Sequence, residues 1–344
     1  MKTASSGPRP LCATRATGFT LLELLVAVAI TLLIASVMLG VVKAALHQLG
    51  RAQADQFQAV SAGQVLDLIQ RDLRAARCRP DGSCWLAVDL INSEAGLANH
   101  GWLLASAPMK PSGPVSLRPL PPDPDDGAPL AGLRFGLGGA WLRFVTTNVE
   151  SGGGLPTVVA YQVARRPVVG NPVAGNSAPI HYAIYRSVVS DSETFAQGYD
   201  VLATAYGSTS NNPSSAMSST YRQPRNVTNP SHANLLANHV VDFGCWLYVR
   251  RADGGLTRIF PHDPADEAHH VVGGSLADET RTPEVVDIFV RVVGDAGVAT
   301  LEALEAGRLV RPAHFSTDAD WWWSVVEENS RVYFRRIEIG RTWP

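Results

Sequence analysis

The sequence predicts an α+β protein in which a long N-terminal helix, apolar first and amphipathic later, packs on an antiparallel β-sheet body. Three observations lead to this prediction. Residues 19–42 are almost entirely apolar, residues 46–77 lack proline and have helical spacing, and apolar segments of strand length bounded by Gly, Pro or Asn follow after residue 140. With 344 residues, 46% of them hydrophobic, the chain can bury a sizeable core.

Residues 19–42 are long enough to cross a bilayer. The only ionisable side chain among these 24 residues is Glu23, and a helix of this length spans about 36 Å, against about 30 Å of hydrocarbon. The preceding residues contain Lys2, Arg9 and Arg15 and no acid, which favours a cytoplasmic N-terminus. We therefore expect a single-pass protein whose body is exported.

Glu23 needs a partner, because a carboxylate in a lipid-facing helix costs about 2.5–3.5 kcal/mol at the bilayer centre and less near an end. No basic residue lies within two helical turns on its C-terminal side. A cut between Gly18 and Phe19 would create a charged amine four residues away. In parallel neighbouring helices, the amine of one subunit would meet the carboxylate of the next, so Glu23 is a candidate assembly residue.

The segment Gly18-Phe19-Thr20-Leu21-Leu22-Glu23, with its basic leader and apolar run, resembles the processing site of type IV prepilins and type II secretion pseudopilins. The resemblance implies that a prepilin peptidase removes residues 1–18 and methylates Phe19, and that Glu23 guides docking onto other pilins or pseudopilins at an assembly platform. It further implies a transmembrane and assembly helix at 19–42, an amphipathic continuation at 43–78 and a globular periplasmic domain at 79–344. The implied function is a minor pilin-like structural subunit in the inner membrane or in a filament.

The second half of the helix is predicted to pack on the body through one face. Apolar residues recur at Leu46, Leu49, Phe57, Val60, Leu66, Ile69, Leu73 and Ala76, and Pro80 marks the end. We expect Leu66, Ile69 and Leu73 to be buried, and Arg71, Asp72 and Arg74 to face water or neighbouring subunits.

Six segments are predicted strands. Residues 140–145, 157–163 and 181–188 should form an antiparallel meander, and 240–249, 284–293 and 331–339 a second group, with a short helix at 298–309. Residues 85–140 and 205–232 are predicted to be surface loops from their Pro, Gly, Ser and Asn content. This order is similar to that of large minor pilins and the J-type minor pseudopilin, or of large prepilin-like proteins from multi-pilin cassettes.

Four cysteines are present, and Cys12 would leave with the leader. Cys78 and Cys84 flank a strong turn sequence and are candidates for a disulfide in an oxidising compartment. Cys245 is an equally suitable partner, and three buried thiols are the alternative.

The sequence offers no catalytic set, because it contains neither a Gly-x-Ser-x-Gly elbow nor a His-Glu-x-x-His motif. A net charge of -2 provides no basic footprint for nucleic acid. Two clusters contain residue types that bind metals, but we interpret both as solvated turns and expect no metal and no cofactor; they are Asp123, Asp125 and Asp126, and His262, Asp263, Asp266, Glu267, His269 and His270.

Three consecutive tryptophans, Trp321 to Trp323, have two interpretations. One or two of the rings pack in the core, or they form an exposed contact for a neighbouring subunit. They also support the alternative function, a signal-anchored periplasmic binding protein for glycans.

Overall fold

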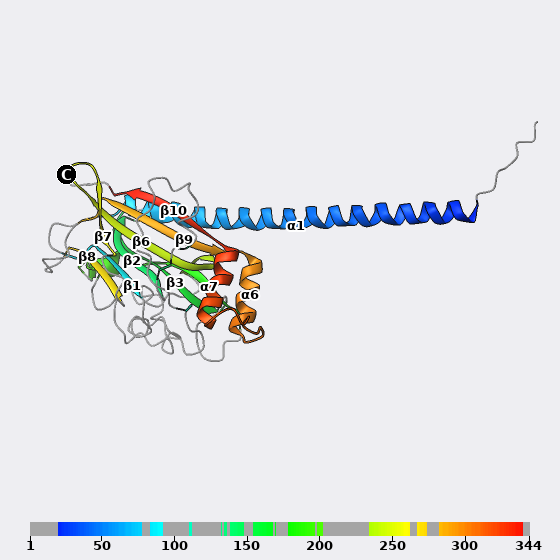
Figure 1. Ribbon diagram of the computed structural model, residues 1–344. Helices are drawn as coiled ribbons and strands as arrows, with labels where there is room; N and C mark the ends of the chain where they lie inside the picture. Colours follow the sequence, from blue (N-terminus) through cyan, green and yellow to red (C-terminus); the bar gives the residue numbers. More distant parts are fainter. Residues whose placement is uncertain are drawn as a thin grey trace, which may run out of the picture. The chain divides into compact units, whose positions relative to one another are not determined.

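The chain divides into two compact units, residues 1–53 and residues 54–344. The computed structural model describes residues 20–77, 83–91, 110–111, 132, 134–135, 138–147, 154–167, 169, 178–196, 198–201, 234–261, 267–273 and 282–339. Helix α1 (Leu21–Arg74) is continuous and runs from the first unit into the second (Figure 1). The predicted long helix is therefore present, and Gly40, Gly50 and Gly63 do not interrupt it.

The body contains two antiparallel sheets (Figure 1). The six-stranded sheet has the order β5-β4-β3-β2-β1-β8, and its strands are β1 (Leu86–Ile91), β2 (Gly139–Thr147), β3 (Pro156–Pro167), β4 (Ile180–Val188), β5 (Leu235–Asn238) and β8 (Glu267–Val272). The four-stranded sheet has the order β10-β9-β6-β7, and its strands are β6 (Val240–Arg250), β7 (Leu256–Phe260), β9 (Val285–Val293) and β10 (Ser330–Glu338). The described helices of the body besides α1 are α4 (Asp191–Ala196), α6 (Asp295–Glu305) and α7 (Asp318–Asn329).

The predicted antiparallel meander is confirmed. Strands β2, β3 and β4 pair in chain order, with Phe144 opposite Val159 and Val159 opposite Val188. Strands β6, β9 and β10 correspond to the second predicted group, and β9 lies between the other two. Most residues of β2, β3, β6 and β9 are buried on both faces, which explains why they are continuous apolar runs.

The prediction of an exposed loop over 85–140 was wrong for its first residues. Strand β1 lies inside the six-stranded sheet between β2 and β8, and Trp85, Leu86, Ala87 and Val88 are buried. The proline and glycine content that suggested a loop belongs to the residues after Ile91. A short strand paired on both sides takes its stability from its neighbours, so the average composition of a long window does not reveal it.

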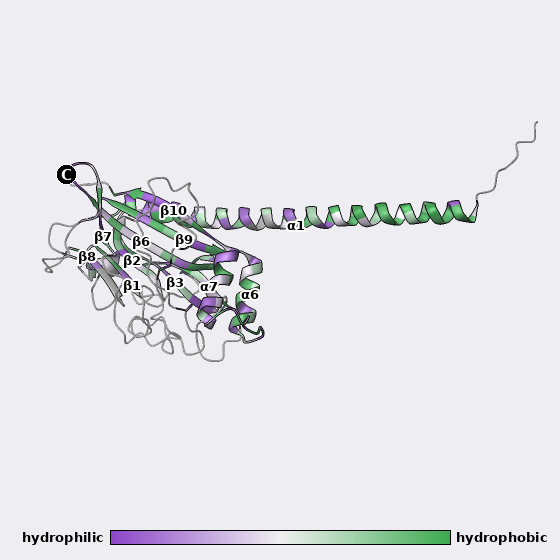
Figure 2. Ribbon diagram, in the orientation of Figure 1, coloured by the Kyte–Doolittle hydropathy of each residue, from purple (hydrophilic) through white to green (hydrophobic). Residues whose placement is uncertain are grey.

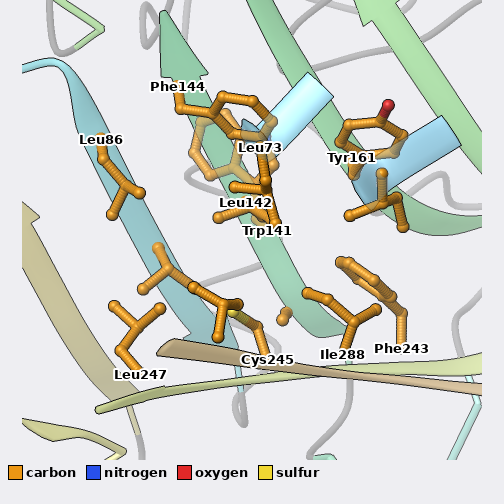
Figure 3. Close-up of a cluster of buried hydrophobic side chains, with 14 of the residues drawn as sticks. Leu73, Leu86, Trp141, Leu142, Phe144, Tyr161, Phe243, Cys245, Leu247 and Ile288 are labelled. Atoms are coloured by element: carbon orange, nitrogen blue, oxygen red, sulfur yellow. The ribbon is translucent and has the colours of Figure 1, made fainter. Parts of the chain in front are cut away.

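The core lies between the two sheets and the body part of α1. Figure 3 shows Leu73 of α1 close to Leu142 and Phe144 of β2, with Cys245, Leu247 and Ile288 of the other sheet below. Leu66 and Ile69 are also buried, as the helical spacing predicts. Burying an aliphatic side chain of this size contributes about 1.5–3 kcal/mol, so this row fixes the helix to the body.

Asp72 corrects the prediction that the helix's charged residues all face water. Arg71 and Arg74 are exposed, but Asp72 is buried and accepts hydrogen bonds from Tyr161 Oη at 2.5 Å and Arg186 Nε at 2.8 Å. Burial and the neighbouring carboxylate raise the pKa of Tyr161, so its hydroxyl remains a donor. The Asp72 carboxylate can lie on the buried face because the Arg186 guanidinium and the Tyr161 hydroxyl both donate hydrogen bonds to it.

Helices α6 and α7 lie side by side (Figure 1). The first was predicted at 298–309 and is found at Asp295–Glu305. The second, which carries the three tryptophans, was not predicted. Trp322 and Trp323 are buried and Trp321 is partly buried, so packing of two rings in the core is confirmed.

Candidate assembly site

Helix α1 begins with a reciprocal pair of hydrogen bonds between Thr20 and Glu23. The Thr20 backbone N–H donates to Glu23 Oε2 at 2.9 Å, and the Glu23 N–H donates to Thr20 Oγ1 at 3.2 Å. The threonine hydroxyl also donates to Glu23 Oε2, at 3.0 Å. This arrangement is a capping box, which satisfies backbone donors that have no partner inside the helix.

Around this box the helix presents apolar side chains outward. Every side chain from Leu21 to Leu46 is exposed, and Leu21, Leu22, Leu32 and Leu39 are each more than 60% exposed. Figure 2 shows the corresponding apolar colouring along this part of α1. Among the described residues, α1 is the one helix long and apolar enough to cross a bilayer. Lipid or other apolar helices must cover this surface.

The body part of α1 has a second exposed apolar face. Phe57 and Val60 are 60% and 52% exposed, whereas Ile69 is fully buried. Because each helical residue turns about 100°, Val60 and Ile69 point to opposite sides of the axis. The helix therefore holds the body with one face and leaves apolar side chains on the other.

The predicted site residues are described only in part. Glu23 is in the structure, whereas Gly18 and Phe19 lie outside the described residues, so cleavage and methylation stay predictions. Thr20 was not singled out from the sequence. The sequence does contain a pattern that predicts its role, because a threonine three residues before a glutamate and next to an apolar run is typical of a capping box.

The proposed disulfide also stays a prediction, because Cys78 lies outside the described residues. Cys84 is buried as a free thiol whose Sγ donates to the Leu86 carbonyl at 3.3 Å. Burial, assisted by the nearby Asp200 and opposed by Arg143, raises the pKa of Cys84 to about 12. Cys245 is buried and free as well, and burial raises its pKa too.

The prediction that the histidine-rich cluster is a solvated turn was wrong for its last residues, because Glu267–Val272 form strand β8 and His270 is buried. Asp123, Asp125, Asp126 and residues 262–266 lie outside the described residues, and of the side chains in the histidine-rich segment only that of His270 is described, in β8. Within the part of the chain that the structure describes, no three His, Cys, Asp or Glu residues are placed to hold a metal ion.

A buried ion pair lies beside the tryptophan helix. Lys110 Nζ is 2.6 Å from Asp242 Oδ1, and both side chains are almost fully excluded from water. The same carboxylate accepts the backbone N–H of Phe135 at 3.1 Å. Burial lowers the pKa of Lys110, and Asp242 opposes this shift. The Lys110 ammonium also lies 5.1 Å from the ring centre of Trp323, so this pair fixes α7 to the core.

The geometry defines a class of protein: a chain with one N-terminal helix able to cross a membrane, capped around a glutamate, and joined to an α+β body. A family model, the prokaryotic N-terminal methylation motif, matches residues 14–39. No curated protein and no solved structure matches the chain. Residues 14–39 therefore carry a prokaryotic N-terminal methylation motif of the type found in type IV prepilins and pseudopilins.

Proposed function

We propose that the protein is a minor pilin-like or pseudopilin-like structural subunit. A prepilin peptidase cleaves it after Gly18, and the mature chain assembles into a type IV pilus or a type II secretion pseudopilus. The observation that supports this most is the methylation motif over residues 14–39, combined with the exposed apolar helix that follows it.

The capping box indicates how Glu23 changes partners during assembly. Before assembly, the carboxylate accepts two hydrogen bonds from Thr20, and neither donor carries a charge. After cleavage, the ammonium of Phe19 in a neighbouring subunit offers a charged donor. The ammonium adds a charge–charge attraction that the uncharged Thr20 donors lack, so the neighbour competes with the cap for the carboxylate. Docking then satisfies two charges that lipid would leave unpaired.

The body helix supports the same proposal. Phe57 and Val60 lie on the face that the body does not cover, where they are available to other subunits of a filament. The alternative, a signal-anchored binding protein that uses the tryptophans and the acidic loops, has lost the part of its support that came from two of the tryptophans. Trp322 and Trp323 are buried among Tyr182, Leu301 and Val326, so their faces are not available to a sugar.

Replacement of Glu23 tests the proposal. We expect Glu23→Ala to be cleaved normally but to be recovered in sheared filaments or with co-purified pilins at less than about one tenth of the wild-type level, the factor that corresponds to about 1.4 kcal/mol. Glu328→Ala, which removes an exposed glutamate of α7, is the matched control and should assemble normally.

Glu23→Gln separates charge from capping, because glutamine also completes a capping box. We expect this variant to assemble as poorly as Glu23→Ala. Normal filament recovery of both variants would contradict the proposed role of the carboxylate.

A further inference from the structure

A small pocket lies between helix α6 and the sheets, and two histidines line it. Its polar lining comes from His181, Tyr182 and His239 on the sheet side and from Glu302 and Glu305 on α6, and Ile180, Val241, Val298 and Leu301 complete the wall. The imidazole rings of His181 and His239 are 5.6 Å apart, centre to centre. Two imidazole side chains therefore share one partly buried site.

His239 lies where the chain passes from one sheet to the other. Its backbone N–H donates to the Tyr182 carbonyl of β4 at 2.8 Å, and its carbonyl accepts the Val293 N–H of β9 at 2.9 Å. Its φ is 63°, an uncommon value for a residue with a side chain. The two backbone hydrogen bonds hold this conformation, so the backbone of His239 is attached to both sheets.

Each histidine faces a carboxylate of the same helix. His181 Nδ1 is 3.3 Å from Glu302 Oε1, and His239 Nδ1 is 3.5 Å from Asp295 Oδ1. Asp295 and Glu302 are seven residues apart and therefore lie on one side of α6. The Asp295 side chain is 80% exposed and that of Glu302 is 41% exposed, so water weakens the attraction of both carboxylates for charged histidines.

The last residue of α6 is held by hydrogen bonds from three side chains. Glu305 accepts hydrogen bonds from Arg165 at 2.6 Å, Tyr182 Oη at 2.8 Å and Trp322 Nε1 at 2.9 Å. Burial raises the pKa of Tyr182, so its hydroxyl stays protonated. Acidification therefore acts on α6 through the two histidines and not through the Tyr182 contact.

We propose that His181 and His239 form an acid-sensitive latch that holds helix α6 against the junction of the two sheets. While both rings are neutral, α6 packs over them. When both are protonated, two positive charges 5.6 Å apart repel each other in a partly buried pocket, and the latch loosens.

The pKa of His239 is shifted in the direction that this latch requires. Burial lowers the pKa of His239 below 6.5, the charge of His181 lowers it further, and Asp295 and Glu302 oppose the shift. The unfolded chain therefore binds this proton more readily than the folded one. The contribution of neutral His239 to the stability of the folded protein is complete above pH 6.5. It is lost as the pH falls from there towards the pKa of His239 in the folded protein.

Coupling between the rings is tested by NMR titration of the full chain in detergent micelles, with isotope-labelled histidine. We expect His239 to titrate below 6.5 in the wild type, and its pKa to rise by about 0.5–2 units in His181→Gln, the range that Coulomb's law gives for this spacing. A His239 pKa that stays the same without His181 would overturn the proposal.

Loosening of α6 is tested separately by hydrogen exchange at about pH 7.5 and about pH 5.5, on either side of the ordinary histidine pKa and corrected for intrinsic rates. We expect the backbone hydrogen bonds of the Val298 to Leu301 amides to open about tenfold more often at the lower pH. This factor corresponds to a repulsion of one pKa unit. His239→Asn, with a residue that tolerates a positive φ, should remove this difference, and His181→Gln provides a second variant.

The exposed His314, in the loop after α6, supplies the control, and His314→Asn should behave as the wild type. Equal protection of α6 at both pH values in the wild type would contradict the latch.

Discussion

At the level of single residues, helices α1 and α7 each begin with a threonine that is hydrogen-bonded to an acidic residue three positions later. Thr20 and Glu23 cap α1, and Thr317 and Asp320 cap α7, where the Asp320 N–H donates to Thr317 Oγ1 at 3.0 Å and the threonine hydroxyl donates to Asp320 Oδ2 at 2.8 Å. In α7 the acid serves the helix alone. In α1 the acid lies at the start of an apolar segment, so it is also available to a neighbouring ammonium.

Asp72 shows how one residue can secure an element. Its side chain and that of Arg186 are both largely buried. Breaking such a pair leaves an unpaired buried charge, so we expect Asp72→Ala to lower the free energy of unfolding by about 3 kcal/mol. Tyr161→Phe removes only one hydrogen bond and should cost about 1 kcal/mol. Urea unfolding of the full chain in detergent measures both values, and equal losses in the two variants would argue against a buried ion pair.

Cys84 gives a prediction that depends on pH. Because the folded thiol has a pKa of about 12, above its ordinary 9.0, it stays protonated at pH 9, where an unfolded thiol is half ionised. We expect a thiol reagent to modify Cys84 in the reduced, folded protein on the order of 100-fold more slowly than in urea. Peptide mapping after labelling identifies the site. Equal rates in the folded and unfolded protein would show that Cys84 is accessible.

At the scale of elements, the sequence predicted those whose apolar pattern is long. The run 19–42 and the spacing of Leu66, Ile69 and Leu73 define α1, and the strands β2, β3, β4, β6, β9 and β10 begin and end close to their predicted bounds. All of these bury enough apolar surface to be recognised from their own residues.

The missed elements depend on partners far away in the chain. Strand β8 contains two histidines and an acid, and it forms because β1 pairs with it along its whole length. Helix α7 is rich in tryptophan, which is a modest helix former, and packing against α6 and the core decides its state. The position of Asp72 is another such case, because its partners Tyr161 and Arg186 come from β3 and β4.

Helix α7 offers a test of its packing. Trp323 is buried and its ring lies near the cations of Lys110 and Arg134, whereas Trp321 is only partly buried. We expect Trp323→Ala to destabilise the protein by about 3–5 kcal/mol, the range for large buried aromatic residues, and Trp321→Ala to cost clearly less. Thermal unfolding monitored by circular dichroism compares the two variants. A larger loss for Trp321→Ala would mean that α7 packs through another face.

At the scale of the whole molecule, the two units expose different kinds of surface. The body buries a core between two sheets and one helix face, as a water-soluble domain does. The described part of the first unit exposes its apolar side chains, a surface suited to contact with lipid or with other apolar helices. A chain built in this way suits a subunit that leaves a bilayer to join a helical assembly, which is the function proposed for it.

The mass of the N-terminal peptide of the protein from its native membranes or filaments tests the central claim most directly. The account predicts a mature chain that begins at Phe19 and carries one methyl group on its amine. A peptide in which any residue before Phe19 is still attached would contradict it.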